Sequence, residues 1–141
     1  VQRGFADCDQ EIDLGIANKH YFISSAKGQD CEFIVNCDQK FDLEISDKQR
    51  LSIDNLSLIE NKLTDPRDNT LDIMVYNHKK SLLGKSKFKL DSHLRNNKIV
   101  VKSRPTSATL IIDNHKVLKT PVAIEMMPKA LNLIVGRNRK F

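Results

Sequence analysis

The sequence predicts an all-β protein, an antiparallel β-sandwich followed by a small β module. Three observations support this prediction. Apolar residues alternate with polar ones along most of the chain after residue 40, which places one side of each run inward and the other outward. The runs are short and closely spaced, and the segments between them are rich in Asn, Asp and Pro, which favour turns. No segment carries a sustained apolar stripe with the 3.6-residue period of an amphipathic helix.

The first 40 residues have a less regular pattern. Ile12-x-Leu14-x-Ile16 and Tyr21-Phe22-Ile23 fit two strands, whereas Ser24–Gln29 is small and polar and is typical of a loop. The apolar segment Glu32–Asn36 fits a buried strand. We therefore expect strands on both sides of a loop in this region.

From residue 41 onward the alternating runs predict one strand after another. They lie at residues 41–45, 51–53, 71–75, 88–90, 99–101, 110–112, 122–126 and 131–135. Asn97 and Asn114 are expected to close tight turns, because Asn tolerates the left-handed backbone conformation. Pro121 is expected to begin an edge strand and Pro128 to end the strand that follows it, because proline has no N–H for a sheet ladder. The best helix candidates are a short turn at 91–95 and a stretch at 56–62.

Charge is divided unequally along the chain. Residues 1–70 contain 8 Lys or Arg and 14 Asp or Glu, a balance of −6, whereas residues 71–141 contain 15 and 4, a balance of +11. The basic half would attract acidic or phosphate-rich partners, and the two halves would also complement each other if they were separate modules. Both interpretations stay open.

The cysteines and the start of the chain bear on the compartment. Cys8, Cys31 and Cys37 allow one disulfide, and six residues of extended strand separate Cys31 from Cys37, so Cys8 would be the partner of one of them. Three unpaired thiols in a reducing compartment are the alternative. The chain starts at Val1 without Met or a basic and then apolar leader, so any signal peptide or neighbouring domain is expected to lie outside it. An extracytoplasmic or envelope location is slightly favoured.

No catalytic, metal or cofactor motif is present in the sequence. It has no Gly-x-Ser-x-Gly, His-Glu-x-x-His, Cys-x-x-Cys or Gly-rich phosphate loop. The four histidines are scattered and are expected to be surface or turn residues. No apolar run approaches the roughly 20 residues of a membrane-spanning helix. The sequence therefore predicts no enzymatic activity, no cofactor and no metal site.

One group of basic residues is the candidate recognition surface. Lysines at 85, 87 and 89 alternate with other residues, so a strand would display them on one face. The candidate anion or partner surface consists of Lys79, Lys80, Lys85, Lys87, Lys89, Lys98, Lys102 and Arg104. Such a surface would bind an anionic lipid or a nucleic acid backbone, or would be a solvated face or a protein interface.

The segment at about residues 100–135 resembles the PEGA domain, a small β module of bacterial envelope and surface proteins. Pro105–Ala108 lies where that family has Pro-Glu-Gly-Ala, and Leu110-x-Ile112-Asp113 matches its strand end. Thr120-Pro121 falls at its Thr-Pro, and Leu131-x-Leu133-x-Val135 matches its last strand. Several of the family's glycines are absent. The resemblance implies a non-enzymatic module and two domains, an N-terminal sandwich at 1–98 and a PEGA-like module at 99–141.

The sequence thus predicts a non-enzymatic binding or scaffolding protein, a component of a larger envelope-associated or secreted assembly. Protein partners are expected, and no small-molecule substrate is inferred. The alternative is a peripheral binder of anionic lipid or nucleic acid through the basic surface of residues 79–104.

Overall fold

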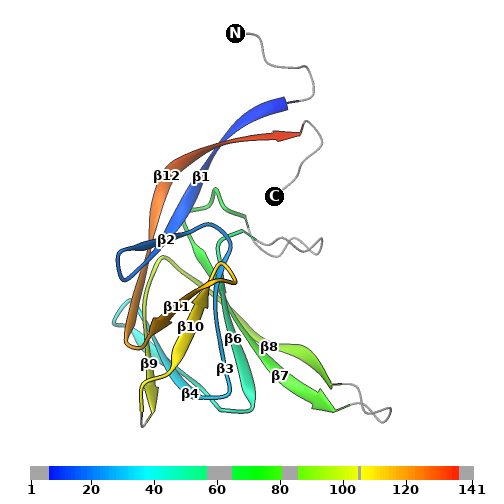
Figure 1. Ribbon diagram of the computed structural model, residues 1–141, viewed down its shortest axis with the longest axis vertical. Helices are drawn as coiled ribbons and strands as arrows, with labels where there is room; N and C mark the ends of the chain where they lie inside the picture. The colour runs from blue at the N-terminus through cyan, green and yellow to red at the C-terminus, as the bar shows by residue number, and fades with distance from the viewer. Residues whose placement is uncertain (1–6, 57–64, 81–85, 105, 137–141) are drawn as a thin grey trace.

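The computed structural model confirms the all-β prediction (Figure 1). It describes residues 7–56, 65–80, 86–104 and 106–136. Twelve strands run through these residues, and none of them is in a helix. The same residues accordingly contain no helix that is long and apolar enough to span a bilayer. The strands form two six-stranded antiparallel sheets, as in a β-sandwich.

The first sheet has the strand order β2-β1-β12-β9-β4-β5. Its strands are β1 (Asp7–Ala17), β2 (His20–Phe22), β4 (Glu32–Cys37), β5 (Phe41–Ile45), β9 (Lys98–Arg104) and β12 (Val122–Gly136). β1 and β12 pair along most of their lengths. Their far ends extend beyond the sandwich as a two-stranded ribbon (Figure 1).

The second sheet has the strand order β11-β10-β3-β6-β7-β8. Its strands are β3 (Ser25–Gln29), β6 (Gln49–Asp54), β7 (Leu71–Lys80), β8 (Ser86–Asn96), β10 (Thr109–Ile112) and β11 (Lys116–Lys119). The ends of β7 and β8 reach past the other strands as a second projecting arm (Figure 1).

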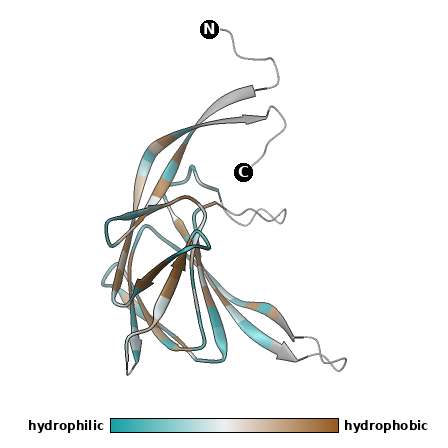
Figure 2. Cartoon of the chain, in the orientation of Figure 1, coloured by the Kyte–Doolittle hydropathy of each residue, from teal (hydrophilic) through white to brown (hydrophobic). Residues whose placement is uncertain are grey.

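One hydrophobic core lies between the two sheets. Along β7 and β8 the brown and teal segments of Figure 2 follow each other, as expected when one side of a strand faces this core. The buried side chains come from both sheets and include Phe22, Phe33, Val35, Leu51, Ile53, Ile73, Val101, Leu110 and Ile124. Burial of each such side chain contributes about 1.5–3 kcal/mol, so this shared core holds the sheets together.

Strands from the two predicted domains are interleaved. β9 pairs with β4 and with β12, and β12 pairs with β1. In the second sheet β10 pairs with β3. The division at residues 98 and 99 stays a prediction, but strands on its two sides are hydrogen-bonded in both sheets and share one core.

The prediction of a loop at Ser24–Gln29 is wrong, because residues 25–29 form β3 in the interior of the second sheet. Its inward positions are Ala26 and Gly28, and both are buried. A Cβ atom on Gly28 would lie 2.7 Å from the Phe33 ring and 2.8 Å from the Leu110 side chain. The neighbouring side chains therefore fill the space that a large residue on β3 would need, and the strand carries no large apolar alternation.

The helix predicted at residues 91–95 is also wrong, since these residues belong to β8. The candidate at 56–62 falls, apart from Leu56, outside the described residues. Asn97 does not close a hairpin, because β8 and β9 lie in different sheets and Asn97 connects them. Its carbonyl accepts a hydrogen bond from the backbone N–H of Met126 at 3.0 Å.

The turn at Asp113 and Asn114 confirms the prediction for Asn114. Both residues have positive φ angles, 50° and 62°, and they connect the paired strands β10 and β11. The Asp113 carboxylate accepts backbone N–H groups of Ile23, Ser24 and Ser25 at 2.9, 2.7 and 3.2 Å. Burial acts to raise the pKa of Asp113, but these hydrogen bonds outweigh it and hold the pKa below its ordinary value.

The predictions for the two prolines were wrong. Pro121, which follows a cis peptide bond, precedes a strand that lies between β1 and β9 and is therefore not at an edge. Pro128 does not end β12, which continues to Gly136. It lies in a bulge where the register with β1 shifts between Ile12 and Leu14. A bulge interrupts the ladder, so the missing N–H of proline is tolerated there.

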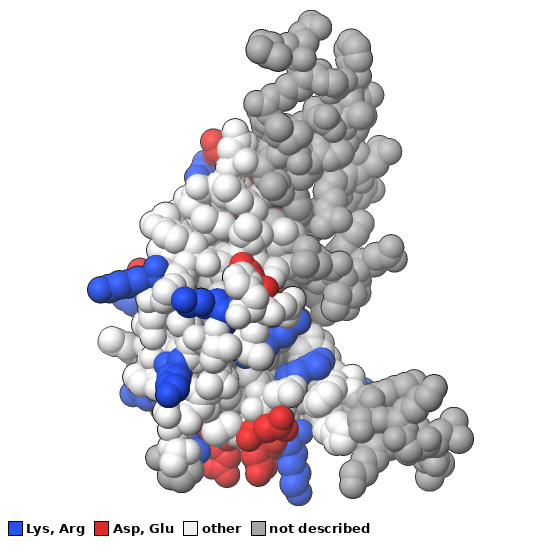
Figure 3. Space-filling view, viewed as in Figure 1, with Lys and Arg blue, Asp and Glu red and all other residues white. Residues whose placement is uncertain are grey.

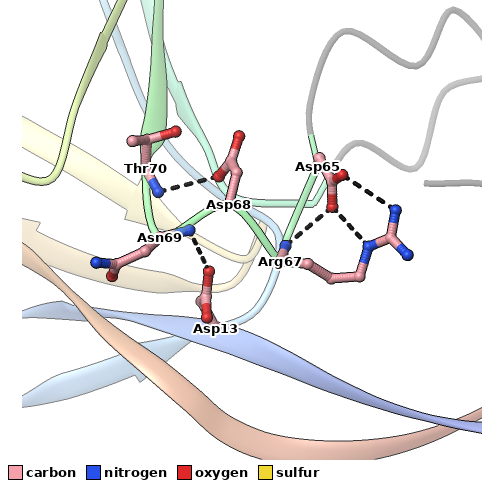
Figure 4. A network of polar contacts seen from close by, with 6 residues as sticks. All are labelled: Asp13, Asp65, Arg67, Asp68, Asn69 and Thr70. Atoms are coloured by element: carbon pink, nitrogen blue, oxygen red, sulfur yellow. Dashed lines mark hydrogen bonds and ion pairs between the residues drawn. The ribbon is translucent and has the colours of Figure 1, made fainter.

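Asp13 lies on β1 at this bulge and is 2% exposed. Its Oδ1 accepts the backbone N–H of Lys129 at 2.9 Å, and its Oδ2 accepts that of Asn69 at 2.6 Å (Figure 4). Its own backbone N–H donates to the Pro66 carbonyl at 2.6 Å, and the Asn55 amide donates to its carbonyl at 2.7 Å. One buried residue thus connects β1, β12 and the segment before β7.

That segment is shaped by further polar contacts, which Figure 4 also shows. The Asp65 carboxylate accepts hydrogen bonds from the Arg67 guanidinium and backbone, and Asp68 accepts the backbone N–H of Thr70 at 3.0 Å. Both carboxylates satisfy donors within their own turn. They hold the turn that Asn69 attaches to Asp13.

We expect Asp13→Ala to destabilise the protein by about 2–4 kcal/mol, because two backbone N–H groups lose a charged acceptor. Asp68→Ala, which removes a carboxylate from an exposed turn, should change the unfolding free energy by less than about 1 kcal/mol. Urea unfolding of the purified protein measures both. Equal losses of unfolding free energy from the two substitutions would contradict this role of Asp13.

Candidate functional site

The outer face of the second sheet carries a cluster of polar side chains. Strand alternation turns Leu51, Ile53, Leu71 and Ile73 into the core, and so turns their neighbours outward. Asp54 of β6 lies opposite Asp72 of β7, and Asp72 lies opposite Arg95 of β8. One row further along, Met74 lies opposite His93. We call Asp54, Asp72, His93 and Arg95 the outer cluster.

Asp72 is the centre of the outer cluster. Its side chain is fully buried, and its Oδ1 lies 2.6 Å from Nε2 of His93 and 3.0 Å from Nε of Arg95. Its Oδ2 is buried without a hydrogen-bond partner among the described residues. A buried carboxylate is stable only when it is paired, so Asp72 fixes His93 and Arg95 in place.

Asp54 adds a second carboxyl group beside Asp72. The Ser52 hydroxyl donates a hydrogen bond to its Oδ1 at 2.5 Å. Burial raises the pKa of Asp54 above its ordinary value, and the Asp72 charge acts in the same direction. The Ser52 hydrogen bond and the charges of Lys27 and His93 oppose this shift without cancelling it. Asp54 is therefore a carboxyl group that gains a proton more readily than an exposed aspartate.

The outer cluster combines charges of both signs, with two carboxyl groups beside one guanidinium and one imidazole. The Arg95 side chain is 59% exposed, and Asp72 holds it through Nε. His93 is also partly exposed. In the described part of the chain no three His, Cys, Asp or Glu side chains are arranged to hold a metal ion. The cluster can thus offer a guanidinium, an imidazole and an exchangeable proton.

The structure places part of the predicted basic surface on the projecting arm of β7 and β8. Lys79 and Lys80 end β7, and Lys87 and Lys89 lie in β8. Lys79 and Lys87 are register partners. Lys85 lies outside the described residues.

The other predicted residues lie elsewhere. Lys98, Lys102 and Arg104 belong to β9 in the first sheet. Arg104 forms an ion pair with Glu44 of β5, with Nη2 and Oε1 2.9 Å apart. The seven described residues of this predicted surface therefore belong to two different sheets.

Sequence reasoning missed the outer cluster. Asp72 and His93 are 21 positions apart and belong to no motif, so only the pairing of β7 with β8 brings them together. One signal was available. In the strand Leu71–Tyr76 the alternation places Asp72 on the side opposite the core, where a carboxylate needs a partner from the next strand. Cys31 and Cys37 are both free thiols, so neither forms the disulfide with Cys8 that the sequence allowed.

Comparisons with known proteins identify the fold. No family model and no curated protein matches the chain, so the PEGA resemblance stays a prediction. A solved structure described as a putative diacylglycerol kinase from Bacillus anthracis str. Sterne matches 89% of this chain with a TM-score of 0.68 and 15% identity. Two further structures, also described as diacylglycerol kinases or putative ones from that organism, match with TM-scores of 0.64 and identities of 19% and 18%.

These matches show the fold as that of a β-sandwich found in proteins described as diacylglycerol kinases or putative ones. This chain spans 56%, 53% and 55% of the three matched chains. The matches contradict the prediction of a non-enzymatic binding or scaffolding protein, and with it the alternative of a peripheral lipid or nucleic acid binder. That prediction rested on the absence of catalytic motifs from this sequence, and such motifs need not lie in the sandwich of an enzyme.

The raised pKa of Asp54 leads to a prediction about pH. Its folded-state pKa lies above the unfolded value, so the ionised carboxylate opposes folding, and this loss of stability develops as pH rises through the folded-state pKa. Asp54→Asn should therefore raise the thermal midpoint slightly at pH 7, and the gain should shrink below about pH 4. Asp47→Asn, in an exposed turn, is the control. A gain that does not vary with pH would contradict this assignment.

Proposed function

We propose that this chain forms the β-sandwich part of a lipid kinase that resembles the diacylglycerol kinases. Such an enzyme transfers the γ-phosphoryl group of ATP to the hydroxyl group of a lipid. The observation that carries the proposal is the match of 89% of the chain to three structures described in this way. Twelve strands can be ordered in two sheets in many ways, so a match over most of this arrangement supports the proposal strongly.

The sequence indicates which part of the reaction the sandwich would serve. A kinase needs a nucleotide site, and this chain has no Gly-rich phosphate loop. The matched chains have a little under half of their length without a counterpart here. We infer that the nucleotide binds in a region corresponding to that remainder and that the sandwich takes part in holding the lipid or the transferred group.

The outer cluster would serve this reaction through charge. In the transfer, the lipid hydroxyl oxygen forms a bond to the γ-phosphorus and its proton passes to solvent. The bond from that phosphorus to the bridging oxygen breaks, and ADP leaves. Catalysis of this step depends mainly on positioning and on stabilising charge on the phosphoryl oxygens. Arg95, held by Asp72, is the group of the described chain that we assign to contact these oxygens.

The test is an assay of the protein at its full natural length with Mg²⁺, labelled ATP and short-chain diacylglycerol in detergent micelles. We expect a labelled phospholipid product, and Arg95→Gln should lower kcat at least tenfold, as loss of a charge-stabilising donor does. Arg104→Gln, equally exposed and on the opposite sheet, should stay near the wild-type rate.

Absence of any lipid product from the folded wild-type protein would overturn the proposal. Equal losses in the two arginine variants would leave the kinase assignment standing and remove Arg95 from the site. Circular dichroism of each variant separates a local effect from unfolding.

A further inference from the structure

The pair of Asp72 and His93 has a geometry that the charge-stabilising role of Arg95 does not use. Nε2 of His93 lies 2.6 Å from Oδ1 of Asp72, and the same oxygen accepts a hydrogen bond from Nε of Arg95 at 3.0 Å. A carboxylate oxygen only accepts hydrogen bonds, so Nε2 is the ring nitrogen that carries a proton. In the neutral ring Nδ1 then has the free lone pair, and the hydrogen bond to Asp72 fixes this tautomer.

The two members of the pair differ in their access to solvent. The side chain of Asp72 is fully buried, whereas that of His93 is 26% exposed. In the ranges that the structure describes, Asp72 is the only group hydrogen-bonded to the His93 ring. A buried carboxylate that orients an accessible imidazole is the arrangement by which enzymes position a general base.

The charges around the ring would stabilise the imidazolium that a proton transfer creates. Oδ2 of Asp72 has no donor among the described residues, so the charge of this carboxylate acts mainly on His93 and Arg95. Asp54 is the register partner of Asp72, and its charge interacts with that of His93. The remaining cation nearby is Lys27, which acts on Asp54. Two carboxyl groups from neighbouring strands thus favour the protonated ring.

A buried apolar side chain lies beside the ring. Met74 is the register partner of His93 and is 2% exposed. The Tyr76 hydroxyl donates to its sulfur at 3.4 Å. The imidazole therefore has protein and not water on this side, which strengthens its interaction with the carboxylate of Asp72.

We propose that His93 is the general base of the phosphoryl transfer, an assignment that rests on the proposed function. As the hydroxyl oxygen of the lipid forms its bond to the γ-phosphorus, Nδ1 of His93 takes the hydroxyl proton and Asp72 stabilises the imidazolium. The bond from the phosphorus to the bridging oxygen breaks, and ADP leaves. The imidazolium then loses its proton to solvent, which restores the neutral ring. Asp72 thus positions both the base and Arg95, the group assigned to the phosphoryl oxygens.

The test compares His93→Gln and His93→Ala with the wild type at full natural length, in the assay with labelled ATP, Mg²⁺ and short-chain diacylglycerol in detergent micelles. Glutamine keeps a donor for Asp72 but has no nitrogen that accepts a proton. We expect both variants to lose about 100-fold in kcat, as removal of a general base does. Added imidazole should restore part of the rate of the alanine variant, because a free ring can enter the space that the side chain leaves. It should not change the rate of the glutamine variant.

The pH dependence of kcat/KM separates a base from a structural residue. In the wild type kcat/KM should fall about tenfold for each pH unit on the acid side, because the protonated His93 ring cannot accept a proton. The alanine variant should lack this fall. Arg95→Gln should lower kcat and keep the fall, and Asp54→Asn, which removes the neighbouring titratable group, should keep it as well.

The matched control is His20→Ala, which removes an exposed histidine from β2 of the first sheet and should keep the wild-type rate and pH dependence. Figure 3 shows Lys and Arg side chains spread across the middle of this view. Every Lys and Arg stays in the histidine variants. A general electrostatic attraction for ATP is therefore preserved and cannot account for a loss of rate.

The outcomes distinguish this inference from the proposed function. A glutamine variant with the wild-type kcat, or an acid-side fall that persists in the alanine variant, would show that His93 only supports Asp72. Either result would overturn the assignment of the base and leave the kinase proposal standing. A folded wild-type protein that forms no lipid product would overturn the kinase proposal itself, and the base with it.

Discussion

The buried carboxylate of Asp13 links the two sheets, which the shared hydrophobic core holds together, and it fixes their relative position at one point. It lies in the first sheet, at the bulge between β1 and β12, and also accepts the backbone N–H of Asn69 two residues before β7 of the second sheet. A carboxylate shielded from water favours these charged hydrogen bonds strongly. Asp13 thus fixes where β7 begins relative to β1, and the register of β7 fixes which residues face outward.

The two halves of the outer face follow from that register. β7 pairs with β8 to bring Asp72 against His93 and Arg95, and β6 and β3 carry Asp54 and Lys27 on the same side. Two carboxyl groups of the second sheet differ in their donors. Asp113 accepts three backbone N–H groups and its pKa is lowered, whereas Asp54 accepts one hydroxyl and its pKa is raised by burial. Burial acts to raise the pKa of both groups, and it prevails at Asp54, which is more deeply buried and has fewer donors.

Much of the fold could be predicted from alternation, and the failures have identifiable causes. The strands after residue 40 carry large apolar residues on one face, so they were predictable. β3 was not, because Phe33 and Leu110 fill the space over Ala26 and Gly28 and leave no pattern in β3 itself. The bulge at Pro128 and the connection from β8 to β9 at Asn97 depend on contacts with residues distant in sequence. The outer cluster was missed for the same reason, since strand pairing alone assembles it.

The unequal charge of the two halves of the chain takes on a different meaning in the folded protein. Strands from both halves alternate in the sheets, so the acidic and basic segments are neighbours and do not form two oppositely charged modules. Arg104 beside Glu44 is a pair that joins the halves, whereas Arg95 and Asp72 pair within residues 71–141. An ion pair neutralises its two charges locally, so the unpaired cations determine the positive charge of a surface. Among the described residues Lys27 and Arg50 form no ion pair, although both come from the acidic half of the sequence. The charge of each surface therefore depends on which residues strand pairing brings together, and not on where the sequence is most basic.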